Sequence, residues 1–341
     1  MIQQSQEQQP LNEKYRPKTL DEVIGQDEVV EAIKNVLQAG YTSHFLFVGA
    51  PGCGKTTIAQ IVANMILEKR QSDSVVDEGA IFMTNASDDR GIDYVRDVIR
   101  HKIEQERFFV IILDEADALT YQAQDALRGL MELAGKRGKP FILTGNYENR
   151  FSPPILSRCM VFKFRKLSWK EIGFRLLEIA ESEGIEVPQT PEYAQFFKFI
   201  SERADGDLRE AIDYLQSAIY VDENGEKRIN TSIAVQQQKP KEMLKQFFAL
   251  VRRGETEGIV SDVRHIEELL QDGKLLPDDI VKTAYEWVIE SKLSDEEIRK
   301  HIIAIADTEA RLKLGTQPII QFAYLISRIY QNALEANGGA R

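Results

Sequence analysis

Residues 45–57 read FLFVGAPGCGKTT, an apolar run followed by a glycine-rich turn and a lysine-threonine pair. The turn matches the G-x-x-x-x-G-K-[ST] phosphate loop at every fixed position, and the apolar run before it has the character of a buried strand. Free backbone N–H groups in such a turn encircle phosphate oxygens, and a helix that begins near Lys55 directs the positive end of its dipole at them. A chance glycine turn would not also supply the strand, the helix, the lysine and the threonine. We therefore predict a nucleotide phosphate site here.

The residues of this loop have different tasks. Glycines at 49, 52 and 54 permit backbone angles and close approaches that a Cβ would block. Lys55 can reach the β- and γ-phosphates, and the hydroxyl of Thr56 can hold Mg²⁺. The residues expected to contact the nucleotide are Gly49, Pro51, Gly52, Cys53, Gly54, Lys55, Thr56 and Thr57.

A second apolar run ends in carboxylates. Residues 108–113, FFVIIL, predict a buried strand, and Asp114-Glu115-Ala116-Asp117 follows it. Ligands bind at the carboxyl ends of the strands in open α/β sheets. Asp114 can therefore hold Mg²⁺, and Glu115 can orient and polarise the attacking water. The alternative, a solvated acidic turn, is less favoured because a phosphate loop lies upstream.

Length and composition indicate a globular protein of two or three domains, with 341 residues of which 43% are hydrophobic and 28% charged. No apolar run approaches the roughly 20 residues that cross a bilayer, and the first ten residues lack a signal-peptide pattern. We expect no membrane partner. Two cysteines, Cys53 and Cys159, indicate a reducing compartment inside the cell. The net charge of −11 argues against a wholly basic surface but leaves room for a local basic stripe.

Strand and helix patterns alternate in the first half of the chain, which predicts a parallel α/β sheet. Further strands are expected at 80–83 and 141–146, the latter ending on Asn146, and helices after Asp27 as an N-cap and over 92–103 and 122–133. From Ser168 onward only helical periodicity appears. It covers 168–183, 191–203 and 207–220, then 241–253, 256–271, 278–291, 295–313 and 317–336.

These patterns divide the chain. We predict a disordered tail at 1–10, an α/β nucleotide-binding domain at 11–166 and a small helical lid at 167–222. A polar linker is expected at 223–240, and an all-helical domain at 241–341. No catalytic constellation occurs in that last region, so its helices are expected to pack against themselves or a partner.

Short motifs along nearly the whole chain resemble, in order and spacing, those of the small subunit of replication factor C, an AAA+ clamp-loader ATPase. The resemblance covers about residues 12–220 by motif, and beyond them only the all-helical character suits the family's collar domain. The motifs are Glu13-Lys14-Tyr15-Arg16-Pro17, Gly25-Gln26, the phosphate loop, Asn85-Ala86-Ser87-Asp88-Asp89-Arg90-Gly91-Ile92, Asp114-Glu115-Ala116-Asp117, Asn146-Tyr147, Ser157-Arg158-Cys159 and Gly206-Asp207-Leu208-Arg209.

The resemblance implies a function. Members of the family join a large subunit and copies or paralogues of the small one in a pentameric spiral. With ATP and Mg²⁺ bound, the spiral opens a ring-shaped, PCNA-like sliding clamp and places it on primer-template DNA, and hydrolysis releases the loader. Such a protein works in the cytoplasm or nucleoid of a prokaryote or in the nucleus of a eukaryote.

The resemblance also implies roles for individual residues. Asn146 would be sensor 1 and Arg209 sensor 2, both contacting the γ-phosphate. Arg158 would be the arginine finger that completes the neighbouring subunit's site. The residues implied at the adenine end of the pocket are Tyr15, Arg16, Pro17, Ile24 and Gly25.

A cluster of arginines is the candidate DNA contact. Arg96 and Arg100 lie four apart on a predicted helix and so share a side, and Arg90 sits near its N-terminus. Acidic neighbours favour a merely solvated face, but the resemblance shifts the balance. It implies that Arg90, Arg96 and Arg150 are at positions where the family lines its inner chamber with basic residues. Such contacts follow the phosphate backbone and are nearly blind to base sequence.

Two departures and two rival functions remain. The family usually reads Ala-Leu-Arg-Arg where Gly129 follows Arg128, and it often pairs arginines where Glu210 follows Arg209. These departures bear on the coupling between DNA and the ATP site.

An AAA+ branch-migration helicase would typically need a winged-helix module, for which region 241–336 offers no strand pair. A nonhydrolysing scaffold subunit is disfavoured by the intact phosphate loop and carboxylates.

Overall fold

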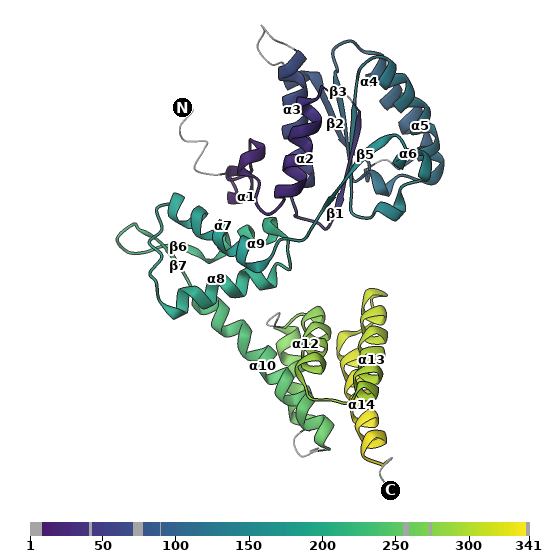
Figure 1. Ribbon diagram of the computed structural model, residues 1–341. Coiled ribbons are helices and arrows are strands. Elements are labelled where there is room, and N and C mark those ends of the chain that lie inside the picture. Colours follow the sequence, from purple (N-terminus) through teal and green to yellow (C-terminus); the bar gives the residue numbers. More distant parts are fainter. Residues whose placement is uncertain are drawn as a thin grey trace. The chain divides into compact units, whose positions relative to one another are not determined.

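The computed structural model describes residues 9–40, 43–70, 78–88, 90–254, 259–272 and 275–338. The chain divides into two compact units, Met1–Asn230 and Thr231–Arg341, which are drawn in Figure 1. Among the described residues, no helix is both long and apolar enough to span a bilayer. The first eight residues, most of the tail expected at 1–10, lie outside the described part.

A parallel sheet forms the centre of the first unit, as the sequence predicted; it has five strands, one more than expected, because no strand was expected at 159–164. The strand order is β2-β3-β4-β1-β5, so β4 lies between the strand that precedes the phosphate loop and the strand that ends in carboxylates. All five strands therefore present their carboxyl ends at one edge, where open α/β sheets bind ligands. The strands are β1 (His44–Gly49), β2 (Ile81–Asn85), β3 (Val110–Asp114), β4 (Phe141–Gly145) and β5 (Cys159–Phe164).

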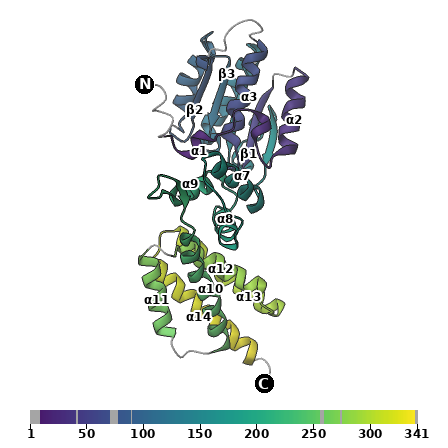
Figure 2. The same cartoon turned by 90° about the vertical axis from the view of Figure 1, so that its left-hand side faces the viewer.

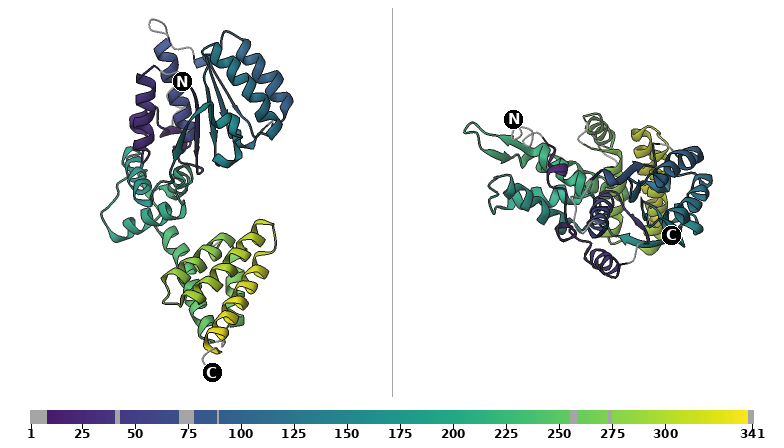
Figure 3. Two further views of the ribbon diagram at one scale, coloured as in Figure 1. Left: turned by 45° about the vertical axis from the view of Figure 1, so that its right-hand side comes forward. Right: turned by 90° about the horizontal axis from the view of Figure 1, so that it is seen from above.

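Helices cover both faces of this sheet, as Figure 3 shows for the view turned by 45°. On one face, α2 (Asp27–Gln38) and α3 (Lys55–Arg70) bury aliphatic side chains against the strands. The opposite face is covered by α4 (Arg100–Glu104), α5 (Tyr121–Lys136) and α6 (Pro153–Leu156). Short helical turns complete this part of the chain: α1 (Leu11–Lys14), η2 (Leu20–Glu22), η3 (Glu78–Ala80), η4 (Tyr94–Ile99), η5 (Ala116–Ala118) and η6 (Glu148–Arg150).

Two local details differ from expectation. The helix expected over 92–103 is π-helical across η4 before it continues as α4. A π turn replaces the i→i−4 pairing with i→i−5, which a sequence period does not reveal. Asp27, expected to cap the helix that follows it, is instead the first residue of α2; Gln26 precedes the helix, and its side chain bonds to Arg165 and does not cap it.

The first unit ends in a helical lid, seen beneath the sheet in Figure 2. It contains α7 (Trp169–Ser182), α8 (Pro191–Arg203) and α9 (Leu208–Ala218). A hairpin of β6 (Ile219–Val221) and β7 (Lys227–Ile229) follows, although no strand was expected there. Strands of three residues are too short to show alternation. The turn between them carries Gly225 at φ +81°.

The second unit is all helical. Its helices are α10 (Ser232–Arg253), α11 (Ile259–Gln271), α12 (Pro277–Glu290), α13 (Asp295–Lys313) and α14 (Pro318–Gly338), and their core includes Phe248, Trp287 and Phe322. The polar linker expected at 223–240 includes the boundary between the two units, after Asn230, and it holds β7 and the first turns of α10. Glutamine and lysine residues favour a helix but create no apolar stripe, so hydrophobic periodicity did not predict the start of α10.

Candidate active site

The phosphate loop joins β1 to α3 and needs its glycines for steric reasons. Gly52 has φ +65°, in the left-handed region that other residues rarely adopt. A Cβ on Gly52 would also lie 1.8 Å from Oδ1 of Asp207, at the start of lid helix α9. At Gly49, a Cβ would lie 2.5 Å from the carbonyl oxygen of Phe164. The loop is thus packed between the sheet and the lid.

Lys55 lies at the centre of the loop and is 8% exposed. Its Nζ donates to the carbonyl oxygens of Gly49 and Ala50 at 2.9 and 2.8 Å, and to Oδ1 of Asn146 at 3.1 Å. Asn146 directly follows β4, so the strand order delivers it beside the loop. Asp117 fixes its backbone by accepting the Asn146 N–H at 2.9 Å. An ammonium group at the centre of the loop can also bind phosphate oxygens of a nucleotide.

Thr56 and Asp114 come together as a candidate metal site. The Thr56 hydroxyl donates to Oδ1 and Oδ2 of Asp114 at 2.9 and 3.1 Å. Thr144 on β4 also donates its hydroxyl to Oδ1 of Asp114. Mg²⁺ takes oxygen ligands and is usually bound by one or two protein groups plus water and substrate phosphates. The hydroxyl and carboxylate fit such an ion, and the described residues contain no cluster of three carboxylate, histidine or cysteine ligands that would suit another metal.

Glu115 follows β3 in an unusual backbone conformation. Its φ is 53°, a left-handed conformation that costs a residue with a Cβ roughly 1 kcal/mol or more. The Glu115 N–H donates to the Thr144 hydroxyl at 3.1 Å, so Thr144 binds both acidic residues. The carboxylate of Glu115 is exposed at the edge of the sheet that carries the loop. Sequence reasoning missed Thr144, because a threonine inside an apolar run reads as an ordinary strand residue.

A pocket extends from the loop to the lid. Of the residues expected to bind nucleotide it is lined by Gly52 to Thr57, by Arg209, and by Tyr15, Arg16, Pro17 and Ile24. Gly25 is not among the lining residues, but it is packed against one of them, because a Cβ on Gly25 would be 2.5 Å from Cδ2 of Leu167. Lining residues that the sequence did not predict include Arg175, Leu208 and Ile212 from α7 and α9. Arg175 and Ile212 belong to none of the quoted motifs, and Leu208 belongs to the Gly206–Arg209 motif, of which only Arg209 was assigned a role.

The N-terminal side of the pocket is bonded to the lid. Oε1 of Glu183, at the end of α7, accepts the Tyr15 hydroxyl at 2.8 Å, and the carboxylate forms ion pairs with Lys14 and Lys227 at 2.5 and 2.6 Å. Burial alone would raise the pKa of Glu183, but these hydrogen bonds lower it to about 2. Burial, followed by the hydrogen bond to Glu183, raises the pKa of Tyr15 to about 12. Arg175 adds a bond of 3.2 Å to the carbonyl oxygen of Tyr15.

Arg158 lies between α6 and β5 and is absent from the lining of this pocket. Its guanidinium donates to Oε1 of Glu132 at 2.6 Å and to the carbonyl oxygen of Pro154 at 2.9 Å. The hydrogen bond from Arg158 lowers the pKa of the Glu132 carboxyl. The arginine is therefore bonded to residues of α5 and α6 and does not line its own chain's nucleotide pocket.

The four candidate DNA-contacting arginines are all exposed. Arg96 and Arg100 line a groove of about 650 Å³ together with residues of α5. Arg90 and Arg150 are outside that lining, but both are tied to the start of α5. The Thr120 N–H donates to the carbonyl oxygen of Arg90 at 3.2 Å, and Gln124 Nε2 donates to that of Arg150 at 2.9 Å.

Gly129 also lines this groove, and a Cβ there would meet no atom within 4 Å. Packing within the chain therefore does not require glycine at this position. In the interior of α5 it should cost roughly 0.5 to 1 kcal/mol relative to alanine.

Comparisons with known proteins agree with this geometry. Residues 45–167 match the family model described as "ATPase family associated with various cellular activities (AAA)", and residues 3–76 match the Rad17 P-loop domain. The replication factor C small subunit of Archaeoglobus fulgidus is 35% identical over 323 residues, which are 92% of this chain and 95% of that protein. The small subunit of Methanococcus vannielii is 33% identical over 94% of this chain and 98% of its own length.

Among solved structures, the RuvB Holliday junction branch migration motor of Thermotoga maritima has a TM-score of 0.53 and 22% identity, covering 97% of this chain and 92% of that one. At this identity the likeness shows a shared fold alone. The sequence relatives are closer and match over nearly their full length. The predicted AAA+ fold and ATPase activity are confirmed, and the chain belongs to the replication factor C small subunit family.

Proposed function

We propose that this chain is a clamp-loader subunit that uses ATP and Mg²⁺ to help open a PCNA-like sliding clamp and place it on primer-template DNA. One observation carries the proposal: Lys55 and Thr56, which line the pocket, are bonded to Asn146 and Asp114 at the ends of β4 and β3, while Arg158 is absent from the pocket lining. A site that lacks its own arginine finger depends on a neighbour to supply one. Hydrolysis would then require assembly, as a loader needs.

Within the pocket each residue has a proposed task. Lys55 binds the β- and γ-phosphates, and Thr56 and Asp114 hold the metal. Mg²⁺, when bound, neutralises charge between the phosphates. Asn146 and Arg209 contact the γ-phosphate from the sheet and from the lid, and the exposed carboxylate of Glu115 orients the attacking water.

The site of the next subunit is where Arg158 would act. An arginine finger stabilises the charge that develops on the transferred phosphoryl group and can be worth about 10³ to 10⁵ in rate. In this chain Glu132 holds the guanidinium at 2.6 Å before any partner arrives. Both groups are partly exposed, so the pair is weak and exchangeable. The second unit, as the family's collar, would hold the subunits together.

DNA would lie against the surface around the start of α5. Arg90, Arg96, Arg100 and Arg150 supply positive charge there, although the whole chain has a net charge of −11. Contacts of this kind are made to phosphates and work for any base sequence. This matches the need of a loader to act at every primer end.

The test is ATP turnover by the chain assembled with its large subunit, with and without clamp and primed DNA. We expect both ligands to stimulate hydrolysis in the parent complex.

Replacing Arg90, Arg96 and Arg150 with alanine should leave ATP binding intact and lower the slope of log affinity for DNA against log salt by about one per lost contact. A triple alanine variant of the exposed lysines Lys163, Lys170 and Lys198 is the control for lost surface charge. An unchanged slope in the arginine variant would contradict the DNA assignment.

A further inference from the structure

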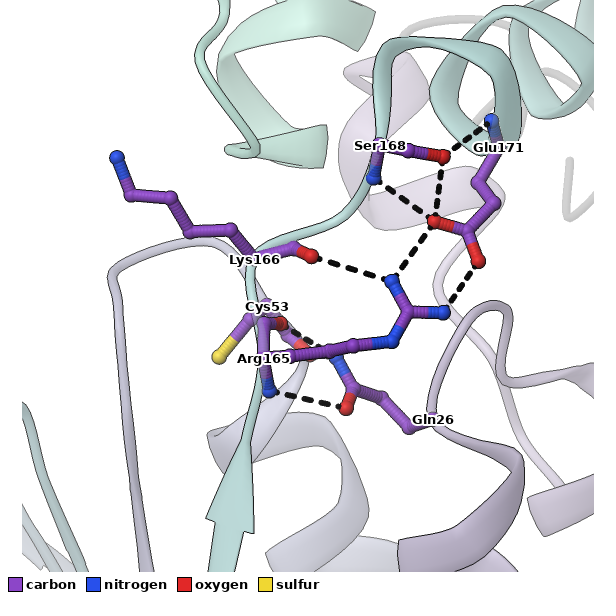
Figure 4. Close-up of polar contacts among 6 residues, drawn as sticks. All are labelled: Gln26, Cys53, Arg165, Lys166, Ser168 and Glu171. Carbon is purple, nitrogen blue, oxygen red and sulfur yellow. Dashed lines mark hydrogen bonds and ion pairs between the residues drawn. The ribbon is translucent and has the colours of Figure 1, made fainter.

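Gln26 is a buried glutamine that belongs to no catalytic group. It is 3% exposed and directly precedes α2. Figure 4 shows its side-chain amide between two backbone segments. Nε2 donates to the carbonyl oxygen of Arg165 at 2.8 Å and to that of Cys53 at 3.5 Å, and Oε1 accepts the Arg165 N–H at 3.3 Å. One side chain thus satisfies three backbone groups.

The two segments that Gln26 joins have different functions. Cys53 is part of the phosphate loop, beside the glycines whose N–H groups would face the nucleotide. Arg165 follows the last residue of β5 and begins the connection to lid helix α7. Buried polar groups are costly to leave unpaired, so the amide holds both segments in one register.

From Arg165 the contacts continue into the lid. Its guanidinium donates to Oε2 and Oε1 of Glu171 at 3.0 and 2.5 Å, a bidentate pair. Glu171 in turn forms a capping box with Ser168 at the start of α7. The hydrogen bond from Arg165 is the main cause that lowers the pKa of Glu171 to about 2, so the carboxylate stays charged. The orientation of α7 is therefore tied to the backbone that Gln26 holds.

The lid also reaches the loop by a second route. Asp207 caps α9, and its carboxylate lies against Gly52, while the Leu208 N–H donates to the carbonyl oxygen of Gly52 at 3.4 Å. Adjacent loop residues are thus linked to the lid in two ways: Cys53 through Gln26 and Arg165, and Gly52 directly through Leu208. Arg209 follows immediately and lines the pocket.

We infer that Gln26 is a positioning residue: it fixes the lid to the phosphate loop so that Arg209 is presented to the nucleotide at the correct place. This inference rests on the nucleotide site of the proposed function. It predicts that the contribution of Arg209 to ATP binding depends on Gln26, although Gln26 is not among the residues that line the pocket.

The test is a double-mutant cycle on ATP affinity in the full chain. Gln26→Met keeps the length of the side chain and removes its hydrogen bonds. We expect ATP binding to weaken about tenfold, and Arg209→Ala to cost about tenfold in the parent but less than about threefold in the Gln26→Met background. Gln26→Asn, which keeps the amide but is one methylene shorter, should give a smaller effect and serves if Gln26→Met does not fold.

Gln124 offers a matched control. It is 2% exposed and also makes three hydrogen bonds, to Leu119, Arg150 and Ser152, which all lie within the α/β part. Gln124→Met should lower stability comparably, yet Arg209→Ala should still weaken ATP binding by its full factor in that background.

A spectroscopic readout is available because Trp169 is the first residue of α7, while the other tryptophan, Trp287, is in the second unit. The ATP-induced change in Trp169 emission should survive Gln124→Met and be reduced in Gln26→Met.

The outcomes separate the inference from the function on which it rests. A parent chain that binds no ATP would overturn the nucleotide site itself. If the parent binds ATP and Arg209→Ala weakens ATP binding equally in the parent and in the Gln26→Met background, only the role of Gln26 is overturned. Equal coupling from Gln124→Met would mean that general loss of stability, and not the connection to the lid, explains the effect.

Discussion

The replacement Glu183→Gln tests how the N-terminal side of the pocket is attached to the lid. The Glu183 side chain is 5% exposed and contacts Lys14, Tyr15 and Lys227. A glutamine side chain at this position would still accept the Tyr15 hydroxyl but would lack the charge that pairs with both lysines. The change therefore isolates the electrostatic part of the attachment.

The magnitude follows from the pKa. Burial alone would raise the pKa of Glu183, yet its hydrogen bonds lower it from the ordinary 4.5 to about 2, so the folded state favours the charged form. Stability from this group is fully present above pH 4.5 and is lost as the pH falls toward 2. The shift alone would correspond to about 3 kcal/mol. Lys14 and Lys227 are 41% and 46% exposed, and screening by solvent reduces the expectation to roughly 1 to 2 kcal/mol.

The assay is urea unfolding of parent and Glu183→Gln chains between pH 7 and pH 2.5. We expect the variant to be less stable at pH 7, and the difference to shrink steadily below pH 4.5. Exposed Glu181, two residues away, provides the control variant Glu181→Gln, which should change little at any pH. A difference between parent and Glu183→Gln that stayed constant down to pH 2.5 would refute the linkage.

Three further predictions concern the active site. Glu115→Gln should bind ATP with near-parent affinity but turn it over far more slowly in the assembled complex; parent-rate hydrolysis would remove its assigned role. Mixing Arg158→Ala with Lys55→Ala subunits should restore part of the turnover that each variant lacks alone, and no rescue in assembled mixtures would count against shared sites. Gly52→Ala should lower the free energy of unfolding by more than about 1 kcal/mol, measured by denaturant titration, because φ is +65° and its Cβ would collide with Asp207.

The sequence predicted the sheet and the phosphate-binding groups because their signals are local. Each signal lies within a short stretch of sequence. One stretch is a strand followed by the loop at 49–56, and the other is a strand that ends in Asp114. Parallel strands then bring these stretches to one edge of the sheet, whatever separates them along the chain. Lys55 and Asn146 meet in this way, although they are 91 positions apart.

The contacts that attach the lid could not be predicted in the same way. Gln26 meets Arg165 across 139 positions and Tyr15 meets Glu183 across 168, with no periodicity to mark either pair. Gln26 and Tyr15 stand in quoted motifs, but a motif does not identify a distant partner, and only the fold brings these residues to Arg165 and Glu183. The β6–β7 hairpin was missed for a different reason, since strands of three residues have no measurable pattern.

These contacts divide the nucleotide pocket between two bodies. Lys55 and Thr56 begin α3 and Asp114 ends β3, all in the α/β part, whereas Arg209 is on a lid helix and Tyr15 is bonded to the lid through Glu183. A bound nucleotide would therefore join sheet and lid, in addition to Gln26 and the contact between Asp207 and Gly52. Loss of the γ-phosphate would remove the part of that link made by Arg209 and leave the protein contacts in place. We therefore expect hydrolysis to loosen the attachment of the lid first and to leave the sheet unchanged.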